Sequence, residues 1–149
     1  MQEAVSARTP AHLWIVGILA LLWNCFGAYD YVMTKTRNMD YLAQMGDPNE
    51  MLAYVEAFPM FAQVGWGLGV WGGLLGAVLL LVKSRYAVHA FAVSLLGMIL
   101  SIGWSLAMGP TPPAGTDEGA MAVMPYVIMV IGVALLYYAT RQRQNGVLR

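Results

Sequence analysis

The stretch from Phe61 to Val82, FAQVGWGLGVWGGLLGAVLLLV, contains no charged residue. An α-helix needs about 20 predominantly apolar residues to cross the hydrocarbon core of a bilayer, so this stretch is long enough to span a membrane. It also holds six of the chain's 16 glycines. A glycine in a water-exposed helix costs roughly 1 kcal/mol relative to alanine, whereas in lipid small residues let neighbouring helices approach closely. The stretch therefore predicts a membrane helix that packs through its glycines.

The composition of the whole chain agrees with a membrane location. Of the 149 residues, 59% are hydrophobic and only 11% are charged, whereas about 25% of the residues in an average soluble domain are charged. Lys plus Arg and Asp plus Glu number 8 each, so the basic face that nucleic-acid binding requires is missing. The single cysteine, Cys25, excludes an internal disulfide and a metal site made only of cysteines.

Three further apolar segments are also long enough to cross a bilayer. The predicted spans cover roughly residues 12–34, 59–82, 86–108 and 121–140. The first begins after Thr9-Pro10, exceeds the length of a signal-peptide core and lacks a small-residue cleavage site, so we interpret it as a retained helix. The sequence predicts an all-α polytopic membrane protein, with four transmembrane helices in one domain over residues 1–149.

The longest predicted loop, residues 35–58, contains a helix start. Asp47 is a suitable N-cap, Pro48 suits the first turn, and Glu50 completes a capping box. The apolar residues that follow share one helix face: Met51, Leu52, Val55 and Phe58. This pattern predicts a short amphipathic helix that lies on the membrane surface or covers the end of the bundle.

Small residues recur at helical spacing in two neighbouring spans. The two stripes are Gly65, Gly69, Gly72 and Gly76 in the second span, and Ser94, Gly97 and Ser101 in the third. The connection between these spans is only Lys83-Ser84-Arg85, which predicts a tight antiparallel hairpin. Because small residues permit close helix approach in lipid, we expect the two stripes to face each other.

Basic residues in short loops predict the orientation of a membrane protein. Six lie on one side of the predicted spans: Arg8, Lys83, Arg85, Arg141, Arg143 and Arg149. Only Lys35 and Arg37 lie on the other side. We therefore expect both termini to be cytoplasmic in a bacterial inner membrane, with residues 35–58 and 109–120 in the periplasm.

Polar side chains within the predicted spans are the first candidates for function. Asn24 lies near the middle of the first span and shares a face with Gly17 and Ala28, which predicts that it points at another helix. Its amide would form an interhelical hydrogen bond worth about 0.6–2 kcal/mol, or it would contact a ligand. Asp30 and Gln63 lie near the periplasmic ends of the first two spans, where they would share a pocket or be solvated separately.

Aromatic residues of the second span are further candidates for ligand contact. Trp66 and Trp71 would fill space between helices or form an aromatic wall for a sugar, a quinone or a lipid. His89 would be an axial ligand to a haem or chlorophyll, but the other histidine, His12, lies as shallow as His89, at the start of the first span, and no histidine lies deep inside a span. Metalloprotease, thiol-pair, serine-hydrolase and phosphate-loop motifs are absent. The sequence predicts no catalytic residue, no metal site and no cofactor.

Four short segments of the chain resemble segments of known membrane proteins. They are Leu22-Trp23-Asn24 with Gly27, the run Gly69–Gly76 after Pro59, the turn Lys83–Ala87, and Phe91–Gly97. Through these segments, which span roughly residues 12–105, the chain resembles small four-helix bacterial inner-membrane proteins that are often labelled "sugar transporter". The resemblance implies a sugar-like ligand, but it implies no catalytic or binding residues.

Two functional hypotheses stay open. The first is a small-molecule, sugar-like transporter or ligand-binding protein, which would work as an oligomer because four short helices enclose little volume. The alternative is a non-catalytic accessory subunit or scaffold of a larger membrane complex, which would dock through its small-residue faces. An enzyme is not favoured because a nucleophile or metal cluster is lacking. The expected partners are the lipid bilayer and other membrane proteins, and not nucleic acid.

Overall fold

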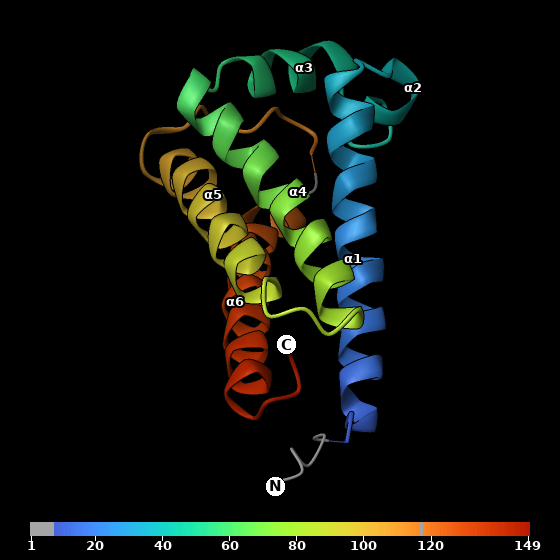
Figure 1. Ribbon diagram of the computed structural model, residues 1–149. Helices are drawn as coiled ribbons and strands as arrows, with labels where there is room; N and C mark the ends of the chain where they lie inside the picture. The colour runs from blue at the N-terminus through green and yellow to red at the C-terminus, as the bar shows by residue number, and fades with distance from the viewer. Residues whose placement is uncertain (1–7, 117) are drawn as a thin grey trace, which may run out of the picture.

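The computed structural model describes residues 8–116 and 118–149. Its four long helices are α1 (Ala11–Lys35), α4 (Met60–Leu81), α5 (Ala87–Met108) and α6 (Glu118–Gln144), and the two short ones are α2 (Met39–Leu42) and α3 (Pro48–Glu56). The short helices lie across one end of the long ones (Figure 1). We call this the cap end, and the opposite end, which holds the turn at residues 82–86, the turn end. Four helices are long and apolar enough to cross a membrane, which confirms the predicted fold class.

The amphipathic helix α3 covers the cap end of the bundle. The predicted N-cap is confirmed, because Asp47 Oδ1 accepts hydrogen bonds from the backbone N–H groups of Asn49 and Glu50, at 2.9 and 3.0 Å. The reciprocal bond of a capping box, from the Glu50 side chain to the Asp47 N–H, is not among the hydrogen bonds of the described residues. Met51 is buried, and the ring of Phe58, just after α3, packs edge-on against Trp104 of α5 with centroids 5.0 Å apart. The helix therefore closes the bundle instead of lying apart from it on the membrane surface.

Helices α4 and α5 form a hairpin in which the two backbones lie in direct contact. A Cβ atom placed on Gly97 would lie 2.5 Å from the carbonyl oxygen of Gly65 and 2.7 Å from the backbone nitrogen of Gly69. The Ser94 hydroxyl donates a 2.6 Å hydrogen bond to the Gly69 carbonyl. A Cβ on Gly65 would lie 3.2 Å from the nitrogen of Ser101, which is buried. Even an alanine side chain would not fit at the centre of this interface.

The next turns of α4 meet α5 less closely but still leave little room. A Cβ on Gly72 would lie 3.1 Å from Ser94 Cα, and one on Gly76 would lie 2.7 Å from the Phe91 ring. Gly73 points elsewhere, since its Cβ would collide with Oδ1 of Asn24 in α1. Helix α4 therefore uses one set of glycines to contact α5 and another to contact α1.

Helix α6 packs against the bundle much more loosely. In the most apolar 18-residue stretch of α6, 6% of the residues are buried, whereas 33% are buried in the corresponding stretch of α4. Among its described residues, Gly132, Ala139 and Gln142 are buried, and its main neighbour is α5. Pro125 lies inside α6, where it removes a backbone hydrogen bond and favours a bend. Helix α6 is thus a weakly embedded wall of the bundle.

The segment after α6 turns back and closes the turn end. Gly146 has a φ of +73°, and the N–H of Val147 donates to the Gln142 carbonyl at 3.0 Å, as in the turn that commonly ends helices at glycine. Val147 and Leu148 are buried in the same apolar cluster as Leu13 of α1. This tail, residues 145–149, was not predicted to be ordered.

Backbone hydrogen bonds fix the tail to the α4–α5 turn. The N–H of Arg149 donates to the Lys83 carbonyl at 2.9 Å, and the N–H of Arg85 donates to the Arg149 carbonyl, also at 2.9 Å. Lys83 Nζ in turn lies 3.3 Å from the Thr9 hydroxyl, which precedes α1. The turn end therefore joins α1, the hairpin and the tail.

Candidate functional site

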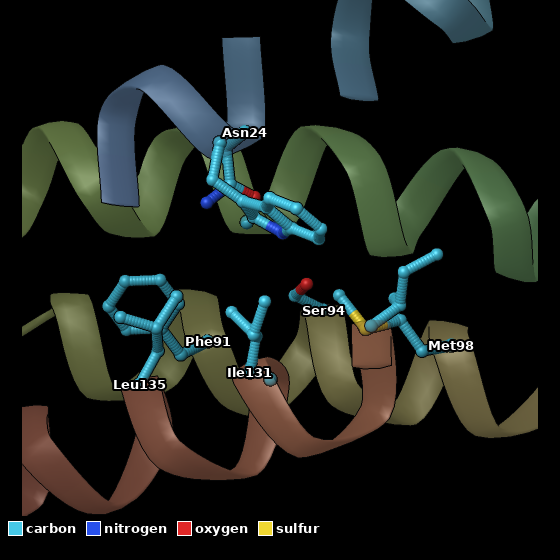
Figure 2. A pocket seen from close by; sticks show the side chains of 10 residues that line it. Asn24, Phe91, Ser94, Met98, Ile131 and Leu135 are labelled. Carbon is cyan, nitrogen blue, oxygen red and sulfur yellow. The ribbon is translucent and has the colours of Figure 1, made fainter. Parts of the chain in front are cut away.

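Asn24 lies in a cavity at the junction of all four long helices. Its side chain is 7% exposed, and it points from α1 into the space between the helices (Figure 2). The cavity encloses about 10 Å³, which is about the room that one water molecule needs. Its lining comes from α1, α4, α5 and α6, and consists of Trp23, Asn24, Gly73, Phe91, Ser94, Met98, Ile128, Ile131, Gly132 and Leu135. The prediction that Asn24 points into the bundle is confirmed.

The polar groups of this cavity already donate hydrogen bonds within the protein. Asn24 Nδ2 donates to the Ala20 carbonyl of its own helix at 2.8 Å, so the described amide bond is intrahelical and not the interhelical bond that was one expectation. The Ser94 hydroxyl donates to the Gly69 carbonyl of α4. Both side-chain oxygens still have acceptor capacity, because an amide oxygen and a hydroxyl each carry two lone pairs.

The two oxygens converge on Gly73 from opposite sides. A Cβ on Gly73 would collide with Asn24 Oδ1 and would lie 3.2 Å from Ser94 Oγ. The missing side chain at Gly73 therefore creates the polar spot of the cavity. The rest of the lining is apolar, with Ile131 and Leu135 pointing in from α6 (Figure 2).

Asp30 does not reach this cavity. Its Oδ1 accepts a 2.7 Å hydrogen bond from the hydroxyl of Tyr41 in α2, and the Tyr41 ring packs edge-on against Tyr29. Burial raises the pKa of the Tyr41 hydroxyl above its ordinary value, and the hydrogen bond and charge of Asp30 raise it further. The hydroxyl consequently stays protonated and donates, so this pair fastens α2 to α1.

Gln63 has different partners from Asp30. Its Oε1 accepts a 2.7 Å hydrogen bond from Lys35 Nζ, and its Nε2 donates to the Phe58 carbonyl at 2.9 Å. The ammonium group of Lys35 also lies 5.3 Å from the centre of the Trp66 ring. Asp30 and Gln63 therefore take part in separate contacts at the cap end, as in the alternative of separate polar sites.

Trp66 and Trp71 both contact one tyrosine of α1. The Tyr31 ring packs edge-on against each of them, with centroids 4.7 Å and 6.0 Å apart. Trp71 is 46% exposed, so it packs against the neighbouring helix α1 through Tyr31 and leaves the rest of its ring uncovered. In a bilayer this ring faces lipid on the outside of α4, and it does not line the cavity.

The two histidines lie near the turn end. His89 is exposed, and its ring lies beside that of Tyr86 with centroids 5.9 Å apart. His12 Nδ1 lies 2.5 Å from the Tyr138 hydroxyl, which links α1 to α6. Across the described residues, no group of three or more His, Cys, Asp and Glu side chains is placed to hold a metal ion.

Most of the cavity lining was missed in the sequence. Phe91 and Met98 read as ordinary apolar residues of a span, and the α6 lining residues Ile128, Ile131 and Leu135 stand in an almost uniformly apolar segment. One usable signal was Gly132, the only glycine between residues 121 and 140. Its Cβ would lie 3.2 Å from Met98 Sδ, so it marks the face of α6 that meets α5.

The fold and the cavity define a class, an integral membrane protein with four apolar helices and a short helical cap. No protein-family model, curated protein or solved structure matches the chain.

Proposed function

We propose that this chain is a non-enzymatic ligand-binding membrane protein of the transporter type, and that its ligand occupies the cavity around Asn24. The observation that carries the proposal is a buried amide at mid-span that lines a cavity shared by four helices. Polar residues within membrane spans are costly and commonly mark ligand or ion pathways. The space enclosed there is about 10 Å³, far below the roughly 300–1,000 Å³ of preformed small-molecule sites. The loosely packed helix α6 must therefore move away from the bundle before a ligand fits.

The lining favours a mostly apolar ligand over a sugar. A sugar carries many hydroxyl groups, and each one that is buried without a hydrogen bond is costly. Among the lining residues, polar side-chain groups are limited to Asn24, Ser94 and the indole N–H of Trp23. The other residues predicted as candidates for ligand contact, Asp30, Gln63, Trp66 and Trp71, lie outside the cavity.

Transport by this protein would require more than one copy. The cavity encloses only about 10 Å³ and does not extend through the whole bundle, since α3 covers the cap end and the tail fills the turn end. We propose that two or more copies associate to complete a path. Cross-linking in native membranes, followed by denaturing electrophoresis, should give a homo-oligomeric ladder; a monomer band alone would contradict oligomerisation.

The second candidate function is an accessory subunit of a larger membrane complex. In the most apolar 18-residue stretch of α6, 6% of the residues are buried. This low burial favours an accessory subunit, because a helix of this kind has a broad face available to another protein. That face includes Val123, Val127, Val130 and Val133, all exposed. Lipid would cover the same face in the ligand-binding alternative.

Purification from native membranes with a matched pair of variants separates the two functions. Ile131→Phe adds volume inside the cavity, whereas Val130→Phe adds the same ring at a neighbouring residue that is 68% exposed. Mass spectrometry of organic extracts should recover a small molecule with the native protein and with Val130→Phe, but not with Ile131→Phe. Identical extracts from all three proteins would contradict a ligand site, and a stoichiometric larger protein in each preparation would favour the subunit.

We further propose that the turn end faces the cytoplasm of a bacterial inner membrane. Thr9, Lys83 and Arg149 lie together at that end, and six of the eight basic residues belong to the segments there. Basic residues accumulate on the cytoplasmic side. A reporter that is active only in the periplasm should be inactive when fused after Arg149 and active when inserted in the 109–116 loop; the reverse result would invert the orientation.

A further inference from the structure

We infer that the turn end binds the headgroup of an anionic phospholipid, and that Lys83, Arg85 and Arg149 hold its phosphate. The inference is independent of the cavity and of the function proposed for it. It follows from the way the fold gathers these three cations, from the excess of positive charge around them, and from the depth of the site in a bilayer.

Two backbone hydrogen bonds hold the three basic residues together. The N–H of Arg149 donates to the Lys83 carbonyl, and the N–H of Arg85 donates to the Arg149 carbonyl, both at 2.9 Å. Val147 and Leu148, just before Arg149, are buried in the apolar cluster, so the end of the tail is fixed at the turn. The side chains of Arg85 and Arg149 are exposed. The fold therefore brings three positive charges to one place and leaves two of them open to the surroundings.

The turn end has more positive than negative charge. Apart from Glu3, which lies outside the described residues, every Asp and Glu of the sequence falls in residues 30–56 or 117–118. Residues 30–56 and the start of α6 belong to the cap half of the molecule. Glu3 and a chain-terminal carboxylate at Arg149 would together offset two of the six basic side chains at the turn end. Because the remaining like charges repel each other, the site attracts an anion from outside the chain.

Lys83 and Arg37 occupy equivalent positions just after a long helix but have different partners. Both have a positive φ, 60° and 56°, at a position where helices commonly end with glycine. At the cap end, Arg37 forms a 2.7 Å salt bridge with Glu56. At the turn end, the described partner of Lys83 Nζ is the uncharged hydroxyl of Thr9, at 3.3 Å. The protein thus supplies a carboxylate to Arg37, whereas the ammonium group of Lys83 is left for an external anion.

The site lies at the depth of the lipid headgroups. Helix α4 ends at Leu81 and α5 begins at Ala87, so the turn between them stands where the two spans leave the hydrocarbon. Trp14 and Tyr86 are 46% and 55% exposed, and such rings are enriched at the membrane interface. Arginine binds phosphate through two parallel hydrogen bonds, and basic clusters beside membrane spans bind anionic headgroups. Depth and charge therefore both favour an anionic phospholipid as the occupant.

Titration of a matched pair of variants tests the site. Phosphatidylglycerol is added to the full-length protein in detergent, and native mass spectrometry gives the apparent dissociation constant of the first bound lipid. The site variant is Arg85→Gln with Arg149→Gln. The control, Arg141→Gln with Arg143→Gln, removes two exposed arginines from the last turn of α6.

Loss of charge-assisted hydrogen bonds predicts a roughly tenfold or greater weakening of lipid binding in the site variant. The control should weaken binding clearly less. Equal weakening in both variants would overturn the site and leave only a diffuse attraction to the basic end. The backbone bonds at the site do not involve the substituted side chains, so both variants should keep the native unfolding temperature.

Three further comparisons test the charge and the source of the phosphate. Arg85→Lys with Arg149→Lys keeps both charges and should bind phosphatidylglycerol more tightly than the site variant; binding as weak as that of the site variant would overturn the role of charge. Phosphatidylcholine, whose headgroup has no net charge, should bind the native protein more weakly, and equal binding would overturn the preference for an anionic lipid. Inorganic phosphate should displace no more lipid than chloride at the same ionic strength; complete displacement would identify a free anion as the occupant instead.

Discussion

The α4–α5 hairpin and helix α6 are similar in hydrophobicity but differ in how they are held. In the hairpin, backbone touches backbone, and a Cβ on Gly97 would lie 2.5 Å from a carbonyl oxygen of the facing helix. In α6, 6% of the apolar window is buried, and the helix is secured near the turn end by the tail and by Tyr138. Hydrophobicity alone thus places a helix in the bilayer, whereas small residues determine which helices pack closely.

The physical reason is that lipid removes the hydrophobic drive for one helix to bury itself against another. Association in the membrane depends on van der Waals packing and on hydrogen bonds between helices. The hairpin has both, through its glycines and through the bond from Ser94 to Gly69. Helix α6 has Gly132 alone in its central part, so we expect it to be the most mobile wall of the cavity.

The largest predicted effect comes from filling the hairpin interface. Gly97→Leu should force the α4 and α5 backbones apart and lower stability by about 3 kcal/mol or more, the upper range for overpacked sites. Thermal unfolding in detergent and in lipid measures the loss. Gly103→Leu is the matched control on the same helix, because a Cβ there would meet no atom within 4 Å. Equal stability of both variants would mean that the hairpin is not the rigid part.

The next effect concerns the tail that holds α6 at the turn end. Leu148 is 4% exposed, and truncating a buried leucine to alanine typically costs about 2–5 kcal/mol. Leu148→Ala should therefore lower the unfolding temperature clearly, and its effect should be nearer the low end because the site lies at the edge of the bundle. Leu22→Ala, at an exposed position of α1, should change it little. If the two variants behave alike, the tail does not anchor α6.

A smaller effect is expected at the cavity itself. Asn24→Leu removes the bond to Ala20 and places an apolar side chain against Gly73, so stability should change by about 1 kcal/mol, the scale of polar contacts within membranes. The recovery of any small molecule that co-purifies with the protein should fall far more than its stability. Phe26→Leu, on the exposed side of α1, is the control. Unchanged recovery with Asn24→Leu would make Asn24 a structural residue only.

The smallest effect is expected on the outer face of α6. Val130→Ala and Val133→Ala remove methyl groups from exposed positions, and surface changes of this kind usually stay within about 0.5 kcal/mol. Differential scanning calorimetry in nanodiscs should show no clear shift for either variant. A large loss of stability in native membranes, but not in nanodiscs holding one copy, would reveal a protein partner on this face.

The sequence predicted the elements that depend on local physics. The charge-free run at residues 61–82, the cap at Asp47 and the short turn at Lys83–Arg85 identified two helices of the hairpin and the amphipathic cap. The predicted small-residue stripes named residues that lie at the α4–α5 contact. These features were visible because each rests on neighbouring residues or on one helical period.

Features that depend on contacts between distant segments were not predicted. Helix α2 is one short turn, and the burial of Leu148 depends on α1 and the hairpin turn, far away in sequence. The candidate site residues were grouped by depth, but depth does not reveal which side of a helix faces a neighbour. Asn24 reaches the cavity, whereas Gln63 and Trp66 face Lys35 and Tyr31 outside it.

A pair of distance measurements tests the contrast between a rigid hairpin and a loosely held α6 most directly. In a Cys25→Ala background, spin labels at Phe26 and Val130 report on α1 and α6, and labels at Leu75 and Leu96 report on α4 and α5; all four native side chains are exposed. Double electron–electron resonance in nanodiscs should give a broad distance distribution for the first pair and a narrow one for the second. Equally narrow distributions for both pairs would contradict the account.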